Sequence, residues 1–419
     1  MQQSDLDRVL ALGRRLFAIA KPMRVLSHLA WPQQVKDDFF AAGARELPVV
    51  SYPEYDAAPL LRELADLSSS LQATPLDAWL GRQIKAIQTT ASMLQHCAQR
   101  EFYTHSKALY GSPDMPLLDG STTSLGLAKR FDDVLDSVSG IDLGEPPPAC
   151  YLADYVAAQI RQRIDPFFGE AAPEVYVVEE LSANALAGAK RIRLRQGACF
   201  TDRDITQLIE HEAFVHVATS LNGRAQTELP MLSISHAGTT RTQEGLAVFA
   251  EFISGNMDLD RLRRLSDRVI AIQMAVEGAD FLQVYDYFCG RVESEDQAFE
   301  STRRVFRGGV LSGGAPFTKD IVYLDGLLRV HNFLRAAVVA GRADCLSLLF
   351  CGKLDLDDIP VLAELRQHGL CAAPRFLPSW ADDRRFLLSY LAYSSFLNQV
   401  EMDKVNQYYA ALLATLPSI

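Results

Sequence analysis

Residues 209–217 read Ile-Glu-His-Glu-Ala-Phe-Val-His-Val, an apolar, helix-like run that constrains the fold more than any other stretch. It holds two imidazoles and one carboxylate within the six residues from His211 to His216. A helix turns about 100° per residue, so histidines five positions apart lie roughly 140° from each other around the axis. Both imidazoles can meet one ion only if the helix carries a one-residue π-type widening. We predict this widening between Ala213 and His216.

Zinc peptidases commonly use His-Glu-x-x-His, in which the Glu is the general base. Residues 211–216 carry the same three side chains with one more position between the histidines. A catalytic zinc takes three protein ligands. His211 and His216 supply two, and Glu244 is the best third, because it lies in the first turn of a second apolar helix, where a carboxylate is favourable. Glu212 would be the general base. Two histidines in a helix are more often structural, but the adjacent Glu and the later helical Glu favour a metal site.

The string from Gln243 to Ala247 reads Gln-Glu-Gly-Leu-Ala. Together with the histidine motif it resembles the bacterial family of flavohemoglobin expression-modulating QEGLA motif proteins. Animal relatives of that family are the microtubule-associated tyrosine carboxypeptidases, which remove the C-terminal tyrosine of α-tubulin. The resemblance covers roughly residues 150–340, including three further strings at 222–226, 304–309 and 317–324. It implies zinc held by His211, His216 and Glu244, with Glu212 catalytic. The substrate of bacterial members does not follow from it, because most bacteria lack tubulin.

A carboxypeptidase must bind a free α-carboxylate, and arginine binds carboxylates with a two-pronged fork. Arg304 and Arg307 lie near the end of a predicted helix, where they are either solvated or part of a site. The resemblance favours both as substrate-binding residues. Lys319 is a candidate second cation, and Asp320 would hold either Lys319 or a ligand histidine. Tyr323 is either a core residue or a hydrogen-bond donor to the tetrahedral oxyanion.

The length of 419 residues allows a sizeable core and two or three subdomains. A triple proline predicts a junction near residue 148. We therefore divide the chain into an N-terminal helical region, a catalytic core and a C-terminal helical region, at 1–148, 149–340 and 341–419.

The apolar patterns predict an α+β fold that is mainly helical. An alternating strand at 174–180 and shorter strands within 181–195 predict a small sheet ahead of the metal helix. This order is typical of a zincin-like metallopeptidase. Residues 182–185 would form the edge strand, which pairs with extended substrate.

The net charge of −11 argues against nucleic acid as an obligate partner, although it also serves solubility. Seven scattered cysteines without a Cys-x-x-Cys predict reduced thiols. The N-terminus lacks a basic and then apolar signal, and no uncharged apolar run reaches membrane-spanning length. We therefore expect a cytoplasmic protein without a membrane partner.

These patterns together predict a zinc-dependent metallopeptidase of carboxypeptidase type acting on a peptide or protein C-terminus. A preference for tyrosine or another aromatic last residue comes from the animal relatives alone. Two alternatives stay open. One is a metal-binding regulatory protein that affects gene expression without turnover, and the other is a metal-dependent hydrolase of a non-peptide amide.

Overall fold

The computed structural model describes residues 3–138, 150–179, 181, 185–188, 190–397 and 402–413. Helices dominate these residues and three short strands form a sheet, so the predicted α+β, mainly helical class is confirmed. The junction near residue 148 and residues 182–184 of the predicted edge strand lie outside the described residues. Within the described part, none of the helices has the length and apolar character needed to cross a lipid bilayer.

The N-terminal region consists of helices that bury apolar faces against one another. Helix α5 begins after Thr74, whose side chain accepts a hydrogen bond from the backbone N–H of Asp77. The helices of this region are α1 (Gln3–Ala20), α2 (Val25–His28), α3 (Gln33–Ala41), α4 (Ala58–Ser69), α5 (Pro75–Gln95), α6 (Arg100–Tyr110) and α7 (Ser124–Ser137).

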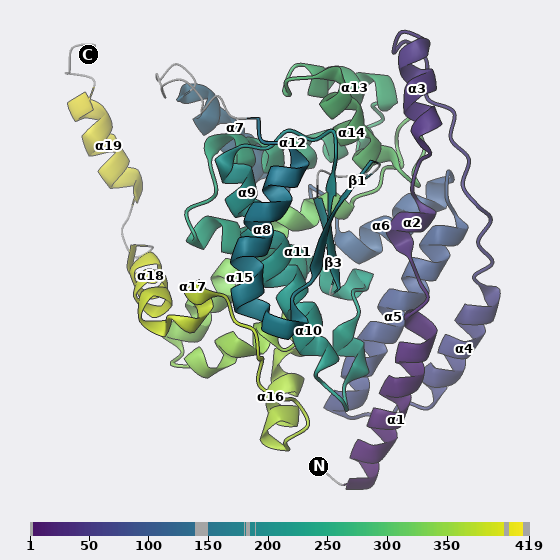
Figure 1. Cartoon of the computed structure of the whole chain (residues 1–419), viewed down its shortest axis with the longest axis vertical. Helices are drawn as coiled ribbons and strands as arrows, with labels where there is room; N and C mark the ends of the chain where they lie inside the picture. Colours follow the sequence, from purple (N-terminus) through teal and green to yellow (C-terminus); the bar gives the residue numbers. More distant parts are fainter. Residues whose placement is uncertain are drawn as a thin grey trace.

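The sheet follows α8 (Ala153–Phe168) and comprises β1 (Glu174–Val178), β2 (Ala185–Gly188) and β3 (Arg191–Arg195). The central strand β3 pairs in parallel with β1 and antiparallel with β2. Side chains alternate along a strand, so Ile192 and Leu194 lie on the same face of the sheet, and both belong to an apolar core that includes residues of α8. Helix α8 lies beside the sheet (Figure 1). The edge strand β2 contacts the segment that carries the two histidines.

The central helices place the candidate site residues. After the sheet come α9 (Asp202–Leu208), a π-helix (Ile209–Val217), α10 (Ala218–Arg224), α11 (Ala237–Ile253), α12 (Leu259–Val276), α13 (Phe281–Cys289), α14 (Glu295–Phe306) and α15 (Val322–Val339). Helices α11 and α15 cross at Gly245 and Gly326, where a Cβ added to Gly245 would lie 2.2 Å from the Gly326 carbonyl carbon. Only glycine allows this close approach, which brings Glu244 near the residues that precede α15.

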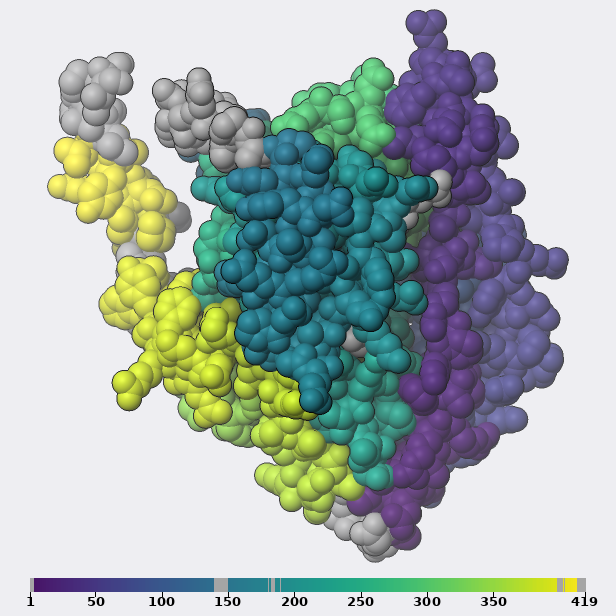
Figure 2. Space-filling view, viewed as in Figure 1, coloured from purple at the N-terminus to yellow at the C-terminus, as the bar shows by residue number. Residues whose placement is uncertain are grey.

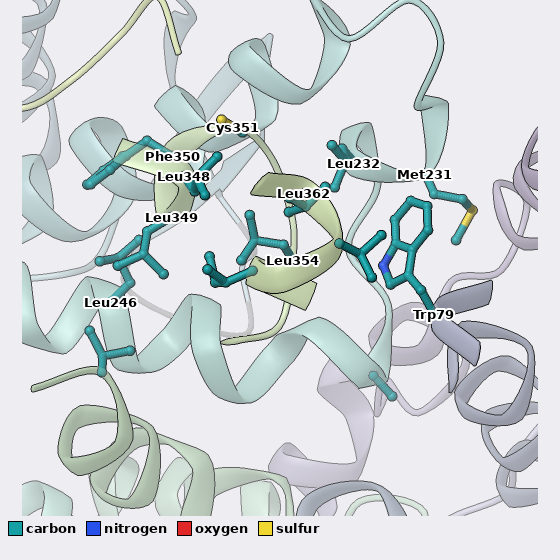
Figure 3. Packing of buried hydrophobic residues seen from close by; sticks show 14 of the residues in the cluster. Trp79, Met231, Leu232, Leu246, Leu348, Leu349, Phe350, Cys351, Leu354 and Leu362 are labelled. Carbon is teal, nitrogen blue, oxygen red and sulfur yellow. The ribbon is translucent and has the colours of Figure 1, made fainter. Parts of the chain in front are cut away.

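The C-terminal region completes the largest core. It contains a 3₁₀-helix (Ala343–Phe350), α16 (Ile359–Gln367), α17 (Ser379–Asp382), α18 (Arg384–Leu397) and α19 (Met402–Leu413). In the core, Leu354 and Leu362 of this region lie between Trp79 and Leu246 (Figure 3). In the space-filling view the N-terminal helices, in purple, form one flank and the C-terminal helices, in yellow, the other (Figure 2). All three predicted regions therefore share one apolar core.

The expectation of reduced thiols throughout is wrong for one pair of cysteines. Cys150 and Cys199 form a disulfide whose Cα atoms lie 5.0 Å apart, within the range that a disulfide spans. The next residues, Tyr151 and Phe200, form an antiparallel bridge with two backbone hydrogen bonds. This bridge places the two cysteines side by side although they are 49 positions apart in the chain. Spacing along the sequence contains no sign of such a contact.

Candidate metal centre

The histidine motif lies in the predicted widened helix. The prediction of a π-type widening is confirmed, but the π-helix spans nine residues, Ile209–Val217, rather than one turn between Ala213 and His216. Backbone hydrogen bonds in a π-helix link residues five apart, so such residues return to nearly the same side. The rings of His211 and His216 accordingly lie 4.9 Å apart between centroids, nearly perpendicular to each other at 87°.

Glu244 faces both rings. It lies in the second turn of α11 and not in the first turn predicted above, because the helix already begins at Ala237, after the N-cap His236. Its Oε2 lies 3.5 Å from Nε2 of His211 and 3.4 Å from Nε2 of His216. One ligand atom from each of the three residues lies within 4.8 Å of the others, so the three side chains could hold a metal ion. The other carboxylate oxygen accepts a hydrogen bond from Nζ of Lys319 at 3.2 Å. Burial opposes ionisation of Glu244, but Lys319 and the two histidines keep its pKa well below the usual range.

The second ring nitrogen of His211 is held by Glu251 rather than by Asp320. Nδ1 of His211 lies 2.6 Å from Oε1 of Glu251, whose carboxylate also accepts two hydrogen bonds from Arg261, at 2.7 and 2.9 Å. Burial opposes ionisation of Glu251, but Arg261 and His211 lower its pKa to about 2. Glu251 follows Glu244 by seven residues, so both point to the same side of α11. The sequence prediction does not include Glu251, although this spacing is visible in the sequence.

Glu212 points from the π-helix toward the sheet. Its Oε2 accepts a hydrogen bond at 3.2 Å from the backbone N–H of Ala187, in the edge strand β2. The side chain is half-buried and lies beside the two histidines in the same helix. Glu212 therefore lies between the edge strand and the metal-ligand candidates.

The two candidate arginines have different surroundings. Arg304 donates two hydrogen bonds to Asp320, from Nε at 2.6 Å and from Nη2 at 3.0 Å. Burial opposes its charge, but Asp320 keeps the pKa of Arg304 above its usual value. Arg304 also donates a hydrogen bond to the hydroxyl of Tyr323 at 3.4 Å. The guanidinium of Arg268, a residue absent from the sequence prediction, lies over the Tyr323 ring, 4.8 Å from its centroid. Asp320 thus neutralises Arg304 and does not hold Lys319 or a histidine by hydrogen bond, contrary to both alternatives considered above.

Arg307 is buried without an anionic partner. It is 7% exposed, its guanidinium lies 5.7 Å from the ring centroid of Phe317, and it forms no side-chain hydrogen bond or ion pair within the described part of the chain. Burial and the neighbouring charge of Arg304 lower the pKa of Arg307 to about 10. A buried cation without a partner is costly, so Arg307 has the surroundings expected for a group that binds an anionic ligand.

Two residues near the site escaped the sequence reasoning because they come from distant parts of the chain. Tyr110, at the end of α6, is buried, which raises its pKa to about 12, and Lys319, Arg307 and Glu244 lie near enough to affect that pKa. Lys353, from the C-terminal region, donates to the backbone carbonyl of His216 at 3.0 Å. No local pattern marks either residue, because neither belongs to the histidine or QEGLA segments.

Comparison with known protein families identifies the family of the chain. The model of the family described as microtubule-associated tyrosine carboxypeptidase matches residues 37–399. The chain belongs to this family. The predicted relation to tyrosine carboxypeptidases is therefore confirmed, and the family is one of carboxypeptidases, which are hydrolases. Its match extends well beyond residues 150–340 and includes Tyr110 and Lys353. No curated protein matches the chain.

Proposed function

We propose that this protein is a zinc-dependent carboxypeptidase that removes the last residue of a peptide or protein. The observation that carries the proposal is the position of one Glu244 oxygen, 3.5 and 3.4 Å from the Nε2 atoms of His211 and His216. Ligand atoms about 2.0–2.2 Å from a tetrahedral zinc lie roughly 3.3–3.6 Å from one another. The two separations from Glu244 fit ligands of one zinc ion, and the ligand atoms of all three residues lie within 4.8 Å of one another.

The donor set also fits zinc. Two imidazole nitrogens and a carboxylate are ligands of catalytic zinc sites. A metal-bound histidine usually donates its other ring N–H to a carboxylate or carbonyl, and His211 has such a partner in Glu251. When bound, zinc would polarise the scissile carbonyl and make water a stronger acid.

The neighbouring residues would perform the proton transfers and bind the peptide. Glu212 would accept the proton of the attacking water and deliver it to the leaving amine. Tyr323 would donate a hydrogen bond to the oxyanion, with Arg268 and Arg304 holding its ring and hydroxyl. The edge strand β2 would pair with the extended substrate. Its Ala187 N–H donates to Glu212, so this edge of the sheet faces the site.

Arg307 is the better candidate for the terminal carboxylate, because Arg304 is already paired with Asp320. Lys319, bound to Glu244, adds a second positive charge beside the site. For the last residue of the substrate we propose tyrosine or another aromatic, following the family's description.

Two measurements test the proposed function. Metal analysis of the purified protein should find about one zinc per chain, as expected for one three-ligand site. Incubation with a peptide library and mass spectrometry should find products shortened by one C-terminal residue. A protein that binds zinc but shortens no peptide would instead favour the regulatory alternative, or the hydrolase of a non-peptide amide if it cleaves such a compound.

Arg307→Met should raise KM for a peptide with a free C-terminus far more than it lowers kcat. Hydrogen bonds to a charged group contribute about 1.5–3 kcal/mol, or roughly 10- to 100-fold in KM. Peptides with an amidated C-terminus provide the control, since the variant and the wild type should cleave them with similar KM. Equal KM of the two proteins for the free peptide would exclude Arg307 as the carboxylate receptor.

Glu251→Gln should weaken zinc binding by about 10- to 100-fold, the usual effect of losing the partner of a metal-bound histidine. The amide removes the negative charge that orients His211 and pairs with Arg261. Competition with a zinc chelator measures this change directly. Glu277→Gln, at the exposed end of α12, is the matched control and should bind zinc as the wild type does. Equal affinities of all three proteins would contradict the role of Glu251.

A further inference from the structure

The two histidines are held in different ways. His211 is oriented through its ring, because Nδ1 contacts Glu251. The Nδ1 atom of His216 is buried and has no hydrogen-bond partner among the described residues. Its backbone carbonyl instead receives three side-chain donors: Ser220 Oγ at 2.7 Å, Lys353 Nζ at 3.0 Å and Thr219 Oγ1 at 3.4 Å. Among the described residues, no hydrogen bond to Nδ1 orients this imidazole, whereas three side chains hold the backbone of the same residue.

The His216 carbonyl lies at a change in helix type. The π-helix ends at Val217 and α10 begins at Ala218. Backbone hydrogen bonds change there from residues five apart to residues four apart. The position of this junction decides whether His216 stays on the same side as His211. Side-chain donors to the His216 carbonyl stabilise the junction where the two imidazoles converge.

Lys353 is the charged member of these donors and is itself rigidly placed. It is 5% exposed, and its backbone N–H donates to the carbonyl of Leu232 at 2.7 Å. The preceding Gly352 packs so closely that an added Cβ would lie 2.6 Å from the Leu232 carbonyl oxygen. Gln243, next to Glu244, donates to the Gly352 carbonyl at 3.4 Å. Gly352 and Lys353 thus contact both α11, which carries Glu244, and the π-helix that carries the two histidines.

The surroundings of the buried Lys353 ammonium group include groups of the metal centre. A buried ammonium needs acceptors or opposite charge nearby, and the His216 carbonyl is its hydrogen-bond acceptor. Burial opposes its positive charge and lowers the pKa of Lys353, while the nearby carboxylates of Glu244 and Glu212 favour the charged form. The ammonium group of Lys353 therefore lies beside the helix of the two histidines and near two carboxylates of the site.

We propose that Lys353 is a positioning residue of the metal centre, which fixes the His216 carbonyl at the end of the π-helix and thereby aims the imidazole at Glu244. The proposal rests on the proposed zinc site. It makes the C-terminal region, through residues 351–354, a necessary part of that site.

Zinc affinity measured by competition with a fluorescent chelator tests the role of Lys353 without depending on turnover. Lys353→Met keeps the apolar stem and removes the donor, so it should bind zinc about 10- to 100-fold more weakly, as other residues behind metal ligands do. Lys353→Arg keeps the charge and the donors and should recover most of this loss. Lys36→Met is the matched control, because Lys36 is a buried lysine paired with Glu300 away from the site. It should lower the unfolding temperature without changing zinc affinity.

Each outcome decides the proposal. The proposal would be overturned if Lys353→Met bound zinc with wild-type affinity. It would also be overturned if Lys36→Met lost as much zinc affinity as Lys353→Met. If Lys353→Met does not fold, Ser220→Ala removes another donor to the same carbonyl and should weaken zinc binding by about 2- to 10-fold. Unchanged zinc binding in Ser220→Ala would then overturn the proposal. Wild-type protein that takes up no zinc would refute the proposed function and this inference together, whereas normal wild-type binding with unaffected variants would refute the inference alone.

Discussion

Glu212→Gln should retain zinc with wild-type affinity and lose turnover by about 10²- to 10⁴-fold, the usual contribution of a general acid or base. Glutamine has nearly the same shape as glutamate, and its side-chain oxygen can still accept the hydrogen bond from the Ala187 N–H. It cannot accept a proton from water. The proposed ligands His211, His216 and Glu244 are unchanged, so the variant should keep its metal while it loses peptide cleavage. Zinc analysis and the initial rate of loss of the C-terminal residue measure the two quantities on the same preparation.

The neighbouring residue provides the control for this experiment. Glu210→Gln makes the same chemical change in the same helix, two positions away. Among the described residues, one oxygen of this carboxylate has no hydrogen-bond partner, and the carboxylate forms no hydrogen bond with the candidate ligands. It should keep both zinc and most of the turnover. If Glu212→Gln and Glu210→Gln cleave peptides equally well, another group is the base, and Glu212 only fastens the edge strand.

His211→Ala should leave the protein folded and essentially free of zinc. The remaining His216 and Glu244 are fewer than the three ligands of a catalytic zinc site, and Glu251 loses the ring that it orients. A ligand that binds only the folded state stabilises it by about 2.7 kcal/mol at 100 times its Kd. Excess zinc should therefore raise the unfolding temperature of the wild type and leave that of His211→Ala unchanged.

A histidine outside the cluster separates loss of the ligand from loss of any imidazole. His331 packs between Phe249 and Tyr390 and is not part of the three-residue cluster. His331→Ala should lose stability and keep one zinc per chain. Zinc bound at full occupancy by His211→Ala would show that these three residues are not the metal site.

The glycines of the α11–α15 crossing show how a site residue depends on packing far from the chemistry. Gly245 follows Glu244 directly and contacts Gly326 more closely than any other residue type would allow. The Gln-Glu-Gly-Leu-Ala string thus contains a candidate ligand and the residue that admits the neighbouring helix. Gln243, the first residue of the string, bonds to Thr219 and to Gly352. The adjacent residues Gln243, Glu244 and Gly245 therefore link the π-helix and α10 with α15 and the C-terminal region.

The local features of the candidate site could be predicted because they depend on angles within single helices. The five-residue spacing of His211 and His216 requires a widened helix if both rings are to meet, and the π-helix Ile209–Val217 has this form. Glu244 could be chosen because an apolar run follows it, although the helix begins seven residues earlier, at Ala237. Glu251 could be chosen by the same helical periodicity, since it follows Glu244 by seven residues. The helical character and the small sheet follow from apolar periodicity, which is also a short-range property of the chain.

Long-range contacts decided the rest. Arg304 and Arg307 are equivalent in the sequence. They differ because folding pairs Asp320 with Arg304 and, among the described residues, leaves Arg307 without a hydrogen-bonded carboxylate. Lys353 reaches His216 across 137 positions of the chain, and Cys150 meets Cys199 through a bridge between two separate segments. Neither periodicity nor motif spacing encodes these neighbours, because they arise where distant elements pack into a common core. The ligand pattern is thus a property of local helix geometry, whereas the charge balance around it is a property of the assembled fold.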